Sequence, residues 1–319
     1  MPSDENDIRL GDVVVSKPTG QSGGVIQYDF GKTMQEGRFE RTGSLNRPPD
    51  VLLTALANLQ SKHMMEGDEL AKHLSAMLRR YPRMAGQFAR PDTQHDLLYD
   101  ANYDHTMEYA TCSQCDTGRL INREPRHLED PFIHYGLIAS GDQVMRHGTT
   151  REQLRKELDV LCFEMEAAGL MDDFPCLVVR GICDYADSHK NKQWQGYAAA
   201  TAAAYAKELL SIIPGNQVTV TRTVVDVTEV DSSTNEMLFR PNRAYRQNFN
   251  YIDPGITLAG PGFSDYSSIP RGDLQLSERS RATAAERIRI ATTSGFIGSR
   301  TCVNSGPFCM LSTVGRDLL

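Results

Sequence analysis

The stretch from Cys162 to Asp187 constrains the fold more than any other part of this 319-residue chain. It contains a short, almost purely apolar run, Cys176 to Val179, which lies between an acidic, proline-containing turn and a polar loop. An apolar run of this length with such flanks is typical of a strand buried in a parallel sheet. Open α/β sheets bind ligands outside the carboxyl ends of their strands, so Asp184 is the first candidate for a functional residue.

Two acids, Glu164 and Glu166, precede that strand on a short segment whose alanines predict a helix. We interpret Glu164 as a structural carboxylate at a helix end, where the helix dipole stabilises a negative charge. Without further information, Glu166 fits either a solvated helix acid or a binding residue. Asp184 and Asp187 also fit a pair of turn residues, since aspartate favours turns and caps, and we interpret Asp187 as structural.

Patterns of strand and helix type alternate through the first two thirds of the chain. Short apolar runs predict strands at 13–15 and 134–140. Apolar residues at helical spacing predict helices at 51–59, 70–81, 150–158 and 194–213. Thr150 and Gln153 have the spacing of a capping box that opens the third helix. This alternation predicts an α/β fold.

The sequence changes character after Gly215. Residues 218–230 alternate like a strand, but polar residues with proline and glycine dominate from there on. Residues 242–319 have no sustained period, apart from one predicted helix near 282–290. We therefore expect an α/β domain over 8–214 and a largely disordered, low-order tail over 215–319.

Three glycines, Gly20, Gly23 and Gly24, lie in the polar segment after the first predicted strand. Glycine-rich loops can cradle phosphate groups, but no lysine stands at the spacing of a P-loop and no clear helix follows. We interpret this segment as an ordinary loop with a short strand. A phosphate-binding loop is the alternative.

Cys112 and Cys115 form a CxxC pair within residues 85–131, where periodicity is weak. A structural zinc site needs about four ligands, which usually come as two such pairs. No second CxxC is present, although His105 and His127 are close in sequence. We interpret the pair as two thiols in a surface loop and predict no metal site, with a redox or metal role as the alternative.

Bulk composition limits the classes of partner. A net charge of −7 argues against nucleic acid, which favours basic surfaces. No apolar run approaches the roughly 20 residues of a membrane span, and the polar start MPSDENDIRL does not resemble a secretory signal. Seven cysteines without a regular framework suit a reducing compartment, so we expect a cytoplasmic protein.

Four motifs, taken in order, carry a family resemblance. They are IRLGDVVVS (8–16), YGLIASGD (135–142), FEMEAAG (163–169) and VVRGICDYAD (178–187). With the alanine-rich final helix, residues 8–213 resemble the purine and uridine phosphorylase superfamily, which includes the methylthioadenosine/S-adenosylhomocysteine nucleosidases. They look most like the fungal members, which are often the N-terminal module of longer proteins. The resemblance implies a phosphorylase/hydrolase-like α/β fold, with a mixed central sheet flanked by helices.

The resemblance implies a role for each matching residue around a bound nucleoside. Glu166 matches the acid that hydrogen-bonds the ribose hydroxyls, and Met165 matches the residue packed under the sugar. Phe163 and the backbone of Val144 and Met145 fall where the family holds the base.

Asp184 matches the acid that hydrogen-bonds or protonates N7 of a purine leaving group. Purine-specific members often carry Ser or Asn at or just before this position, whereas here the neighbour is Cys183, whose thiol is a weaker donor.

The implied reaction breaks the N-glycosidic bond of a purine-type nucleoside. Positive charge grows on the sugar, as in other glycosidic cleavages, and the leaving base takes electrons. An acid at N7 therefore lowers the barrier, by about 10²–10⁴-fold for general acid catalysis. The nucleophile is phosphate in a phosphorylase and water in a nucleosidase. No cofactor is implied beyond phosphate as a co-substrate, and a homo-oligomer is implied by the family.

The family domain normally begins before the segment that matches Ile8. We therefore expect that its first strands, glycine-rich phosphate loop, phosphate-binding arginine and water-activating carboxylate are absent, which leaves phosphorolysis and hydrolysis open. The hypothesis is a half-site with impaired catalysis. The alternatives are a non-catalytic nucleoside-binding or interaction module of a larger fungal protein, and a nonfunctional relic.

Overall fold

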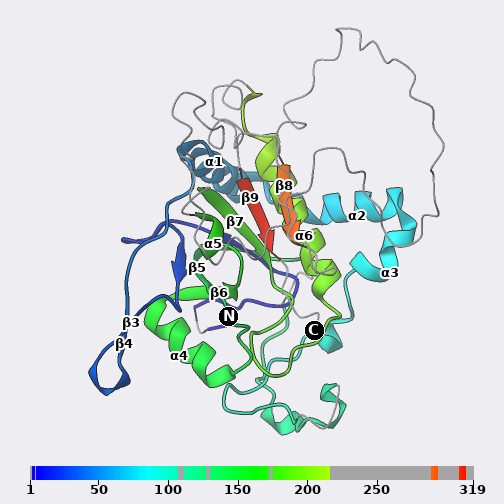
Figure 1. Ribbon diagram of the computed structural model, residues 1–319. Helices are drawn as coiled ribbons and strands as arrows, with labels where there is room; N and C mark the ends of the chain where they lie inside the picture. The colour runs from blue at the N-terminus through cyan, green and yellow to red at the C-terminus, as the bar shows by residue number, and fades with distance from the viewer. Residues whose placement is uncertain are drawn as a thin grey trace, which may run out of the picture.

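A computed structural model describes residues 2–3, 5–106, 111–126, 130–171, 175–215, 289–293 and 309–313. Its centre is a seven-stranded sheet in which the strands follow the order β2-β5-β1-β7-β9-β8, with β6 paired to β5 (Figure 1). The strands of this sheet are β1 (Val13–Ser16), β2 (Val25–Gln27), β5 (Ile133–Ser140), β6 (Val160–Glu164), β7 (Cys176–Gly181), β8 (Arg289–Thr293) and β9 (Cys309–Thr313). A separate two-stranded sheet joins β3 (Gly31–Thr33) and β4 (Phe39–Arg41).

The central sheet is mixed, as the sequence predicts. Strand β5 runs parallel to β1, β2 and β6, whereas β7 runs antiparallel to β1 and parallel to β9. The prediction that β7 is a strand of a parallel sheet is therefore wrong for its pairing with β1, which is antiparallel. Every residue of β7 is buried, which explains why the strand reads as a continuous apolar run.

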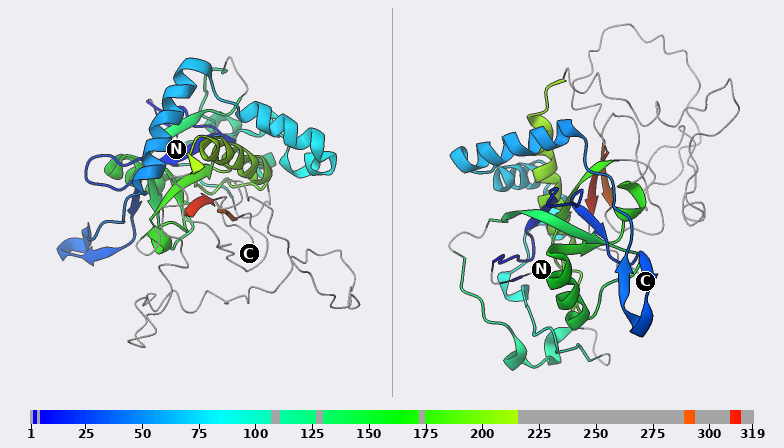
Figure 2. Two further views of the ribbon diagram at one scale, coloured as in Figure 1. Left: turned by 90° about the horizontal axis from the view of Figure 1, so that it is seen from above. Right: turned by 90° about the vertical axis from the view of Figure 1, so that its left-hand side faces the viewer.

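Helices cover the sheet unevenly. They are α1 (Asp50–Glu66), α2 (Leu70–Arg80), α3 (Ala85–Phe88), α4 (Gly148–Leu158), α5 (Ala168–Met171) and α6 (Gln195–Ser211), with short 3-10 turns at 35–37, 82–84, 93–95, 112–114 and 117–119. Helix α6 packs on β7 and β1, and α1, α2 and α3 pack in turn against α6 (Figure 2). Helix α4 contacts β6. The helices predicted around 51–59, 70–81, 150–158 and 194–213 are all present.

The alanine content of α6 follows from how closely it approaches β7. A Cβ atom added at Gly181 would overlap the backbone carbonyl oxygen of Ala198. Only small residues allow two backbones to come this close. Most residues of α6 are buried, and so is Trp194, which directly precedes the helix. This close contact therefore holds the end of β7, where the following loop begins, against α6.

Two local predictions differ from the structure. Helix α4 begins at Gly148 with His147 as its N-cap residue, so Thr150 lies inside the helix and does not open a capping box. The Oγ1 atom of Thr150 lies 2.8 Å from Nδ1 of His147. Glu164 ends strand β6 and does not start a helix, because its segment pairs with β5.

Two strands come from the segment for which the sequence predicts low order. Strand β9 pairs with β7 from Cys176 to Arg180, so it covers an edge of β7 that would otherwise present unpaired backbone groups. Arg289 and Ile290, the end of the helix predicted near 282–290, lie in β8. The remainder of that helix and the strand predicted at 218–230 lie outside the described residues.

The segment with the three glycines forms a loop that contains an isolated bridge between Thr19 and Ser22 and leads into the short strand β2. This agrees with the interpretation as an ordinary loop. Among the helices that the structure describes, each is too short or too polar to cross a bilayer.

Candidate active site

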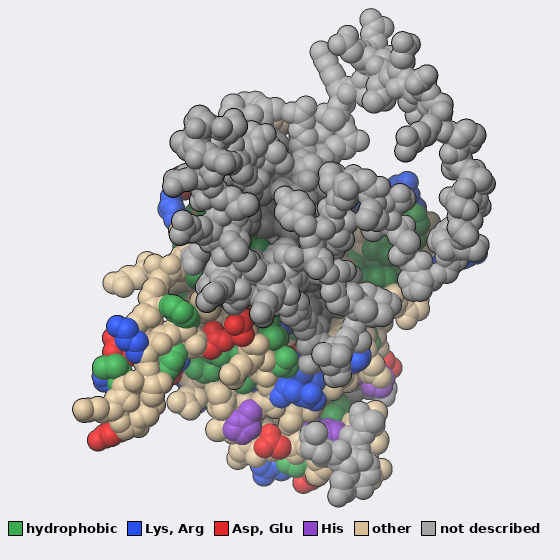
Figure 3. Space-filling view, viewed as in Figure 1, with side chains coloured by type: hydrophobic (Ala, Val, Ile, Leu, Met, Phe, Trp, Pro, Cys, Tyr) green, Lys and Arg blue, Asp and Glu red, His purple; other side chains and the backbone are tan. Residues whose placement is uncertain are grey.

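The structure brings all six residues that the resemblance singles out to the wall of one cleft. Three segments form it: the loop after β5, the carboxyl end of β6, and the end of β7 with the loop that follows. The residues along it are Gln143, Val144, Met145, Phe163, Glu164, Met165, Glu166, Arg180, Asp184, Ala186 and Lys190. Acidic, basic and hydrophobic side chains lie close together on the face of the molecule shown in Figure 3.

Glu164 shapes the turn that follows β6. Its side chain is buried, and its Oε2 atom accepts hydrogen bonds of 2.9 Å from the backbone N–H groups of Glu166 and Ala167. Burial and the nearby charge of Glu166 raise the pKa of Glu164 to about 7. These contacts agree with a structural role for Glu164, which holds the turn that presents Glu166.

Glu166 lies in this turn, and its side chain is half-buried. Its Oε2 atom accepts a hydrogen bond of 3.1 Å from the backbone N–H of Met165. Because its own backbone N–H is bound to Glu164, the direction of the Glu166 side chain depends on a buried neighbour. A carboxylate held in this way can accept hydrogen bonds from two adjacent hydroxyl groups.

Asp184 follows β7 and is largely shielded from solvent, with a side-chain exposure of 8%. Its Oδ1 atom accepts a hydrogen bond of 2.8 Å from the backbone N–H of Ala186 and lies 3.5 Å from Nζ of Lys190. The thiol of Cys183 donates to Oδ2 at 3.5 Å. The thiol is therefore one of the groups that contact the Asp184 carboxylate.

The charge state of Asp184 follows from its neighbours. Burial acts to raise its pKa, but the positive charges of Lys190 and Arg180 and the hydrogen bonds outweigh it, so the pKa of Asp184 lies below its usual value. Asp184 is therefore ionised at neutral pH in the free protein. It can accept a proton or a hydrogen bond directly, but it can donate one only after taking up a proton.

Arg180 and Lys190 line the cleft but were missed by sequence reasoning. Arg180 lies near the end of β7 and is 7% exposed. One signal was available, because a charged residue inside an otherwise apolar strand needs a partner of opposite charge. No comparable feature of the sequence pointed to Lys190, because a lysine among polar loop residues is not unusual.

Part of the cleft wall is apolar. The ring of Phe163 packs edge-to-face on Tyr28, with ring centroids 5.7 Å apart, and the Tyr28 hydroxyl donates a hydrogen bond of 3.0 Å to the carbonyl oxygen of Gln143. This contact ties the end of β6 to the loop that carries Val144 and Met145. A flat aromatic base can stack against such a surface.

The cleft is nearly closed, with a cavity volume of about 20 Å³. Pockets that bind small ligands usually enclose about 300 Å³ or more. A nucleoside can therefore enter only if side chains around the cleft move. Val144, which is 38% exposed, lies on the loop between β5 and α4 and is the most exposed apolar residue of the wall.

Asp187 has structural partners. Its Oδ2 atom lies 3.4 Å from Nη1 of the buried Arg151, and its Oδ1 atom accepts a hydrogen bond of 2.9 Å from the backbone N–H of His189. Nη1 of Arg151 also donates to the carbonyl oxygen of Tyr185 at 2.9 Å. These bonds hold the loop after β7 against α4, in agreement with the interpretation of Asp187 as structural.

A larger cavity of about 560 Å³ lies elsewhere, between residues 9–12, 90–98, 117–126 and 130–131. Four of its charged side chains form ion pairs: Arg126 lies 2.8 Å from the buried Asp12, and Arg123 lies 3.1 Å from Asp96. This pairing favours a structural network over a site for a charged ligand. The smaller cleft, where the predicted residues meet, is the candidate active site.

No protein-family model matches the chain. Over 213 residues, the chain is 45% identical to a nucleotide-binding leucine-rich repeat (NLR)-like protein of Hyaloscypha variabilis, a match that covers 67% of this chain and 21% of that protein. Over 89 residues it is 33% identical to the 5'-methylthioadenosine/S-adenosylhomocysteine nucleosidase of Mycobacterium bovis, covering 26% and 35% of the two chains.

A third relative is the aminodeoxyfutalosine nucleosidase of Helicobacter pylori, which is 29% identical over 130 residues, covering 38% of this chain and 56% of that protein. The chain thus spans between about a fifth and somewhat over half of the length of these relatives. The two nucleosidases confirm the resemblance drawn from the four motifs. Over part of its length, the chain is thus similar to nucleosidases of the nucleoside phosphorylase and nucleosidase superfamily.

Proposed function

We propose that this chain binds purine-type nucleosides in the cleft and cleaves the bond between the ribose and the base. The observation that carries the proposal is that Glu166, which follows β6, and Asp184, which follows β7, meet on the wall of one cleft with Phe163 and Met165. The similarity to nucleosidases from two bacteria supports the same chemistry.

In this proposal Glu166 accepts hydrogen bonds from the ribose hydroxyls. Its negative charge strengthens these bonds as positive charge grows on the sugar in the transition state. Met165 packs under the sugar, and Phe163 with the backbone of Val144 and Met145 holds the base. Glu164, buried and bound to the turn, keeps Glu166 in position.

Asp184 acts at N7 of the base. Because Asp184 is ionised in the free protein, we propose that it takes up a proton when the nucleoside binds. It then gives that proton to N7 while the base leaves with the electron pair of the broken bond. Water or phosphate attacks the sugar carbon as the bond to the base breaks, and an attacking water releases its extra proton to the solvent. The reaction needs no redox step and no cofactor beyond phosphate, if phosphate is the nucleophile.

The second candidate is a non-catalytic module that senses or binds a nucleoside within a larger protein. The observation that favours it is the match to the NLR-like protein, of which this chain covers 21%. A homo-oligomer and a cytoplasmic location stay predictions under either function.

The test measures release of free base from inosine, adenosine, methylthioadenosine and uridine, with and without phosphate. Asp184→Asn is compared with Asp159→Asn, which makes the same chemical change at an exposed position where the left-handed backbone (φ 52°) suits asparagine. Release that falls only in Asp184→Asn supports the enzyme, and its phosphate dependence separates phosphorolysis from hydrolysis. Binding by calorimetry without release from the folded, unmodified chain favours the module.

A further inference from the structure

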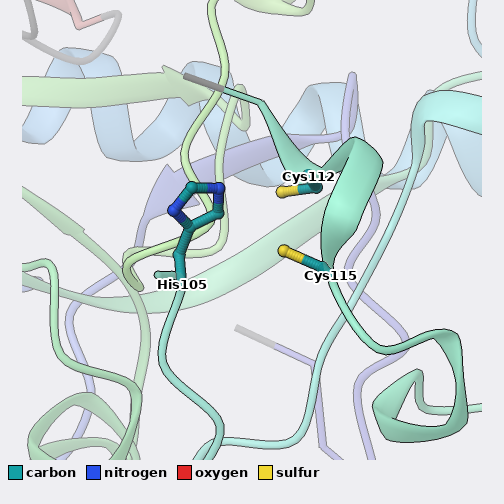
Figure 4. A group of neighbouring side chains, drawn as sticks. All are labelled: His105, Cys112 and Cys115. Atoms are coloured by element: carbon teal, nitrogen blue, oxygen red, sulfur yellow. The ribbon is translucent and has the colours of Figure 1, made fainter. Parts of the chain in front are cut away.

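A side-chain cluster outside the cleft joins His105 to Cys112 and Cys115. One ligand atom from each residue, an imidazole nitrogen or a sulfur, lies within 4.8 Å of the other two. The two cysteines stand at the ends of a 3-10 turn (Cys112–Gln114 with Cys115 as its C-cap), and both sulfur atoms point toward the imidazole of His105 (Figure 4). The CxxC pair therefore has a third donor that its spacing in the sequence did not reveal.

The donor set matches a particular class of ion. Two thiolates and one imidazole favour a soft or borderline metal such as Zn²⁺ over Mg²⁺ or Ca²⁺, which prefer oxygen ligands. In tetrahedral zinc sites with bonds of about 2.0–2.3 Å, ligand atoms lie about 3.5–4 Å apart. Closing the cluster onto an ion thus requires shifts of only about 1 Å.

A buried neighbour points independently to a missing ligand. The side chain of His189 is 3% exposed, and among the described residues neither of its ring nitrogens has a hydrogen-bond partner. Its ring stacks on Tyr99 at a centroid distance of 4.1 Å and lies edge-to-face against His105 at 5.6 Å. Its Nδ1 atom lies 4.0 Å from Oδ1 of Asp187, which is beyond hydrogen-bond distance. Buried polar atoms rarely lack a hydrogen bond, so this imidazole beside the cluster marks a place where a polar group or ion is expected.

The cluster is attached to the segment that leads to the candidate active site. The backbone N–H of His105 donates a hydrogen bond of 2.9 Å to Oγ of Ser188, and the Cys112 thiol lies 3.9 Å from the carbonyl oxygen of His189. Lys190, the ion-pair partner of Asp184, follows directly in the chain. An ion bound by the cluster would therefore hold the surface loop against the loop after β7.

We propose that His105, Cys112 and Cys115 bind one Zn²⁺ ion, with the fourth coordination position open to water. A single CxxC pair in the sequence predicts no metal site. Tertiary structure supplies the third ligand and changes that expectation. The competing chemistry is a disulfide between Cys112 and Cys115, which needs no contribution from His105.

The test uses the full chain, reduced and freed of metal with a chelator. Titration with Co²⁺ as a spectroscopic probe should give thiolate-to-cobalt charge-transfer absorption that saturates at one equivalent, and Zn²⁺ should displace the cobalt. This measurement requires no variant, so misfolding of a mutant cannot produce it. Absence of the charge-transfer band in the reduced, folded chain would overturn the proposal.

Variants then assign the ligands. Cys112→Ser and Cys115→Ser should abolish the charge-transfer band. His105→Ala should weaken Zn²⁺ binding by more than about 100-fold, the upper end of the cost of losing even an outer-shell partner. His147→Ala, at an exposed histidine away from the cluster, is the matched control. Unchanged Zn²⁺ affinity in His105→Ala would contradict the proposal. It would also be contradicted if Zn²⁺ did not protect the two thiols from alkylation and only their oxidation did.

Discussion

The ammonium group of Lys190 lies 3.5 Å from Oδ1 of Asp184, and both side chains are largely withdrawn from solvent, at 12% and 8% exposure. At this degree of burial an ion pair is screened less than on the surface, and its effect on protonation is correspondingly larger. The pair therefore controls the protonation of the residue proposed to act on the leaving base.

Replacing Lys190 by methionine should change the pH dependence of base release. Loss of the ammonium group removes the largest influence that lowers the pKa of Asp184, so that pKa rises. If Asp184 must carry a proton, the decline of kcat/KM with increasing pH moves to higher pH in Lys190→Met. Lys192→Met, two residues away and exposed, should leave the profile in place. An unmoved profile in Lys190→Met would show that this pair does not set the protonation of Asp184.

Glu166→Gln should lower kcat/KM for ribonucleosides by about 10–100-fold, the typical worth of hydrogen bonds to a charged group. A 2′-deoxynucleoside lacks one of the hydroxyls, so the same substitution should cost it less. Glu40→Gln, on the exposed strand β4, is the control. Equal losses for both substrates would argue that Glu166 does not contact that hydroxyl.

Glu164 should make stability depend on pH. Its pKa in the folded protein, about 7, lies above the value of about 4.3 expected in the unfolded chain. The folded state then binds more protons between these values, so the free energy of unfolding falls as pH rises from about 4 to 7, by roughly 3 kcal/mol at most.

Glu164→Gln keeps an oxygen that can accept from the N–H groups of Glu166 and Ala167 but cannot ionise. Urea unfolding at several pH values should show that the variant gains stability relative to the unmodified chain as pH rises. The control is again Glu40→Gln. A constant difference between Glu164→Gln and the unmodified chain across this range would refute the assignment of the raised pKa.

Gly181→Ala should destabilise the fold by about 1–3 kcal/mol or more, because the added methyl group meets the carbonyl oxygen of Ala198 on α6. Gly86→Ala in α3 is the matched substitution, since a Cβ atom there meets no neighbour within 4 Å. Thermal unfolding of both variants gives the comparison. Similar melting temperatures would mean that α6 can shift away from β7 at little cost.

The pattern of apolar residues along the chain predicted many of the strands and helices. The apolar runs at β1, β5 and β7 and the alanine-rich α6 were recognisable because burial on both sides leaves a clear mark on the sequence. The helix expected at Glu164 begins only at Ala168, because Glu164 pairs with β5 as the last residue of β6. Strands β8 and β9 lie in a region whose composition gave no such signal.

The sequence by itself determined which residue types are available. Through four ordered motifs, it also predicted which of them form a nucleoside site, Phe163, Met165, Glu166 and Asp184 among them. Only the tertiary structure decided what surrounds these residues. It placed Lys190 against Asp184 and His105 against the CxxC pair, because such contacts depend on where separate segments of the chain meet. Periodicity and spacing report neighbours along the chain, whereas charge and coordination act between neighbours in space.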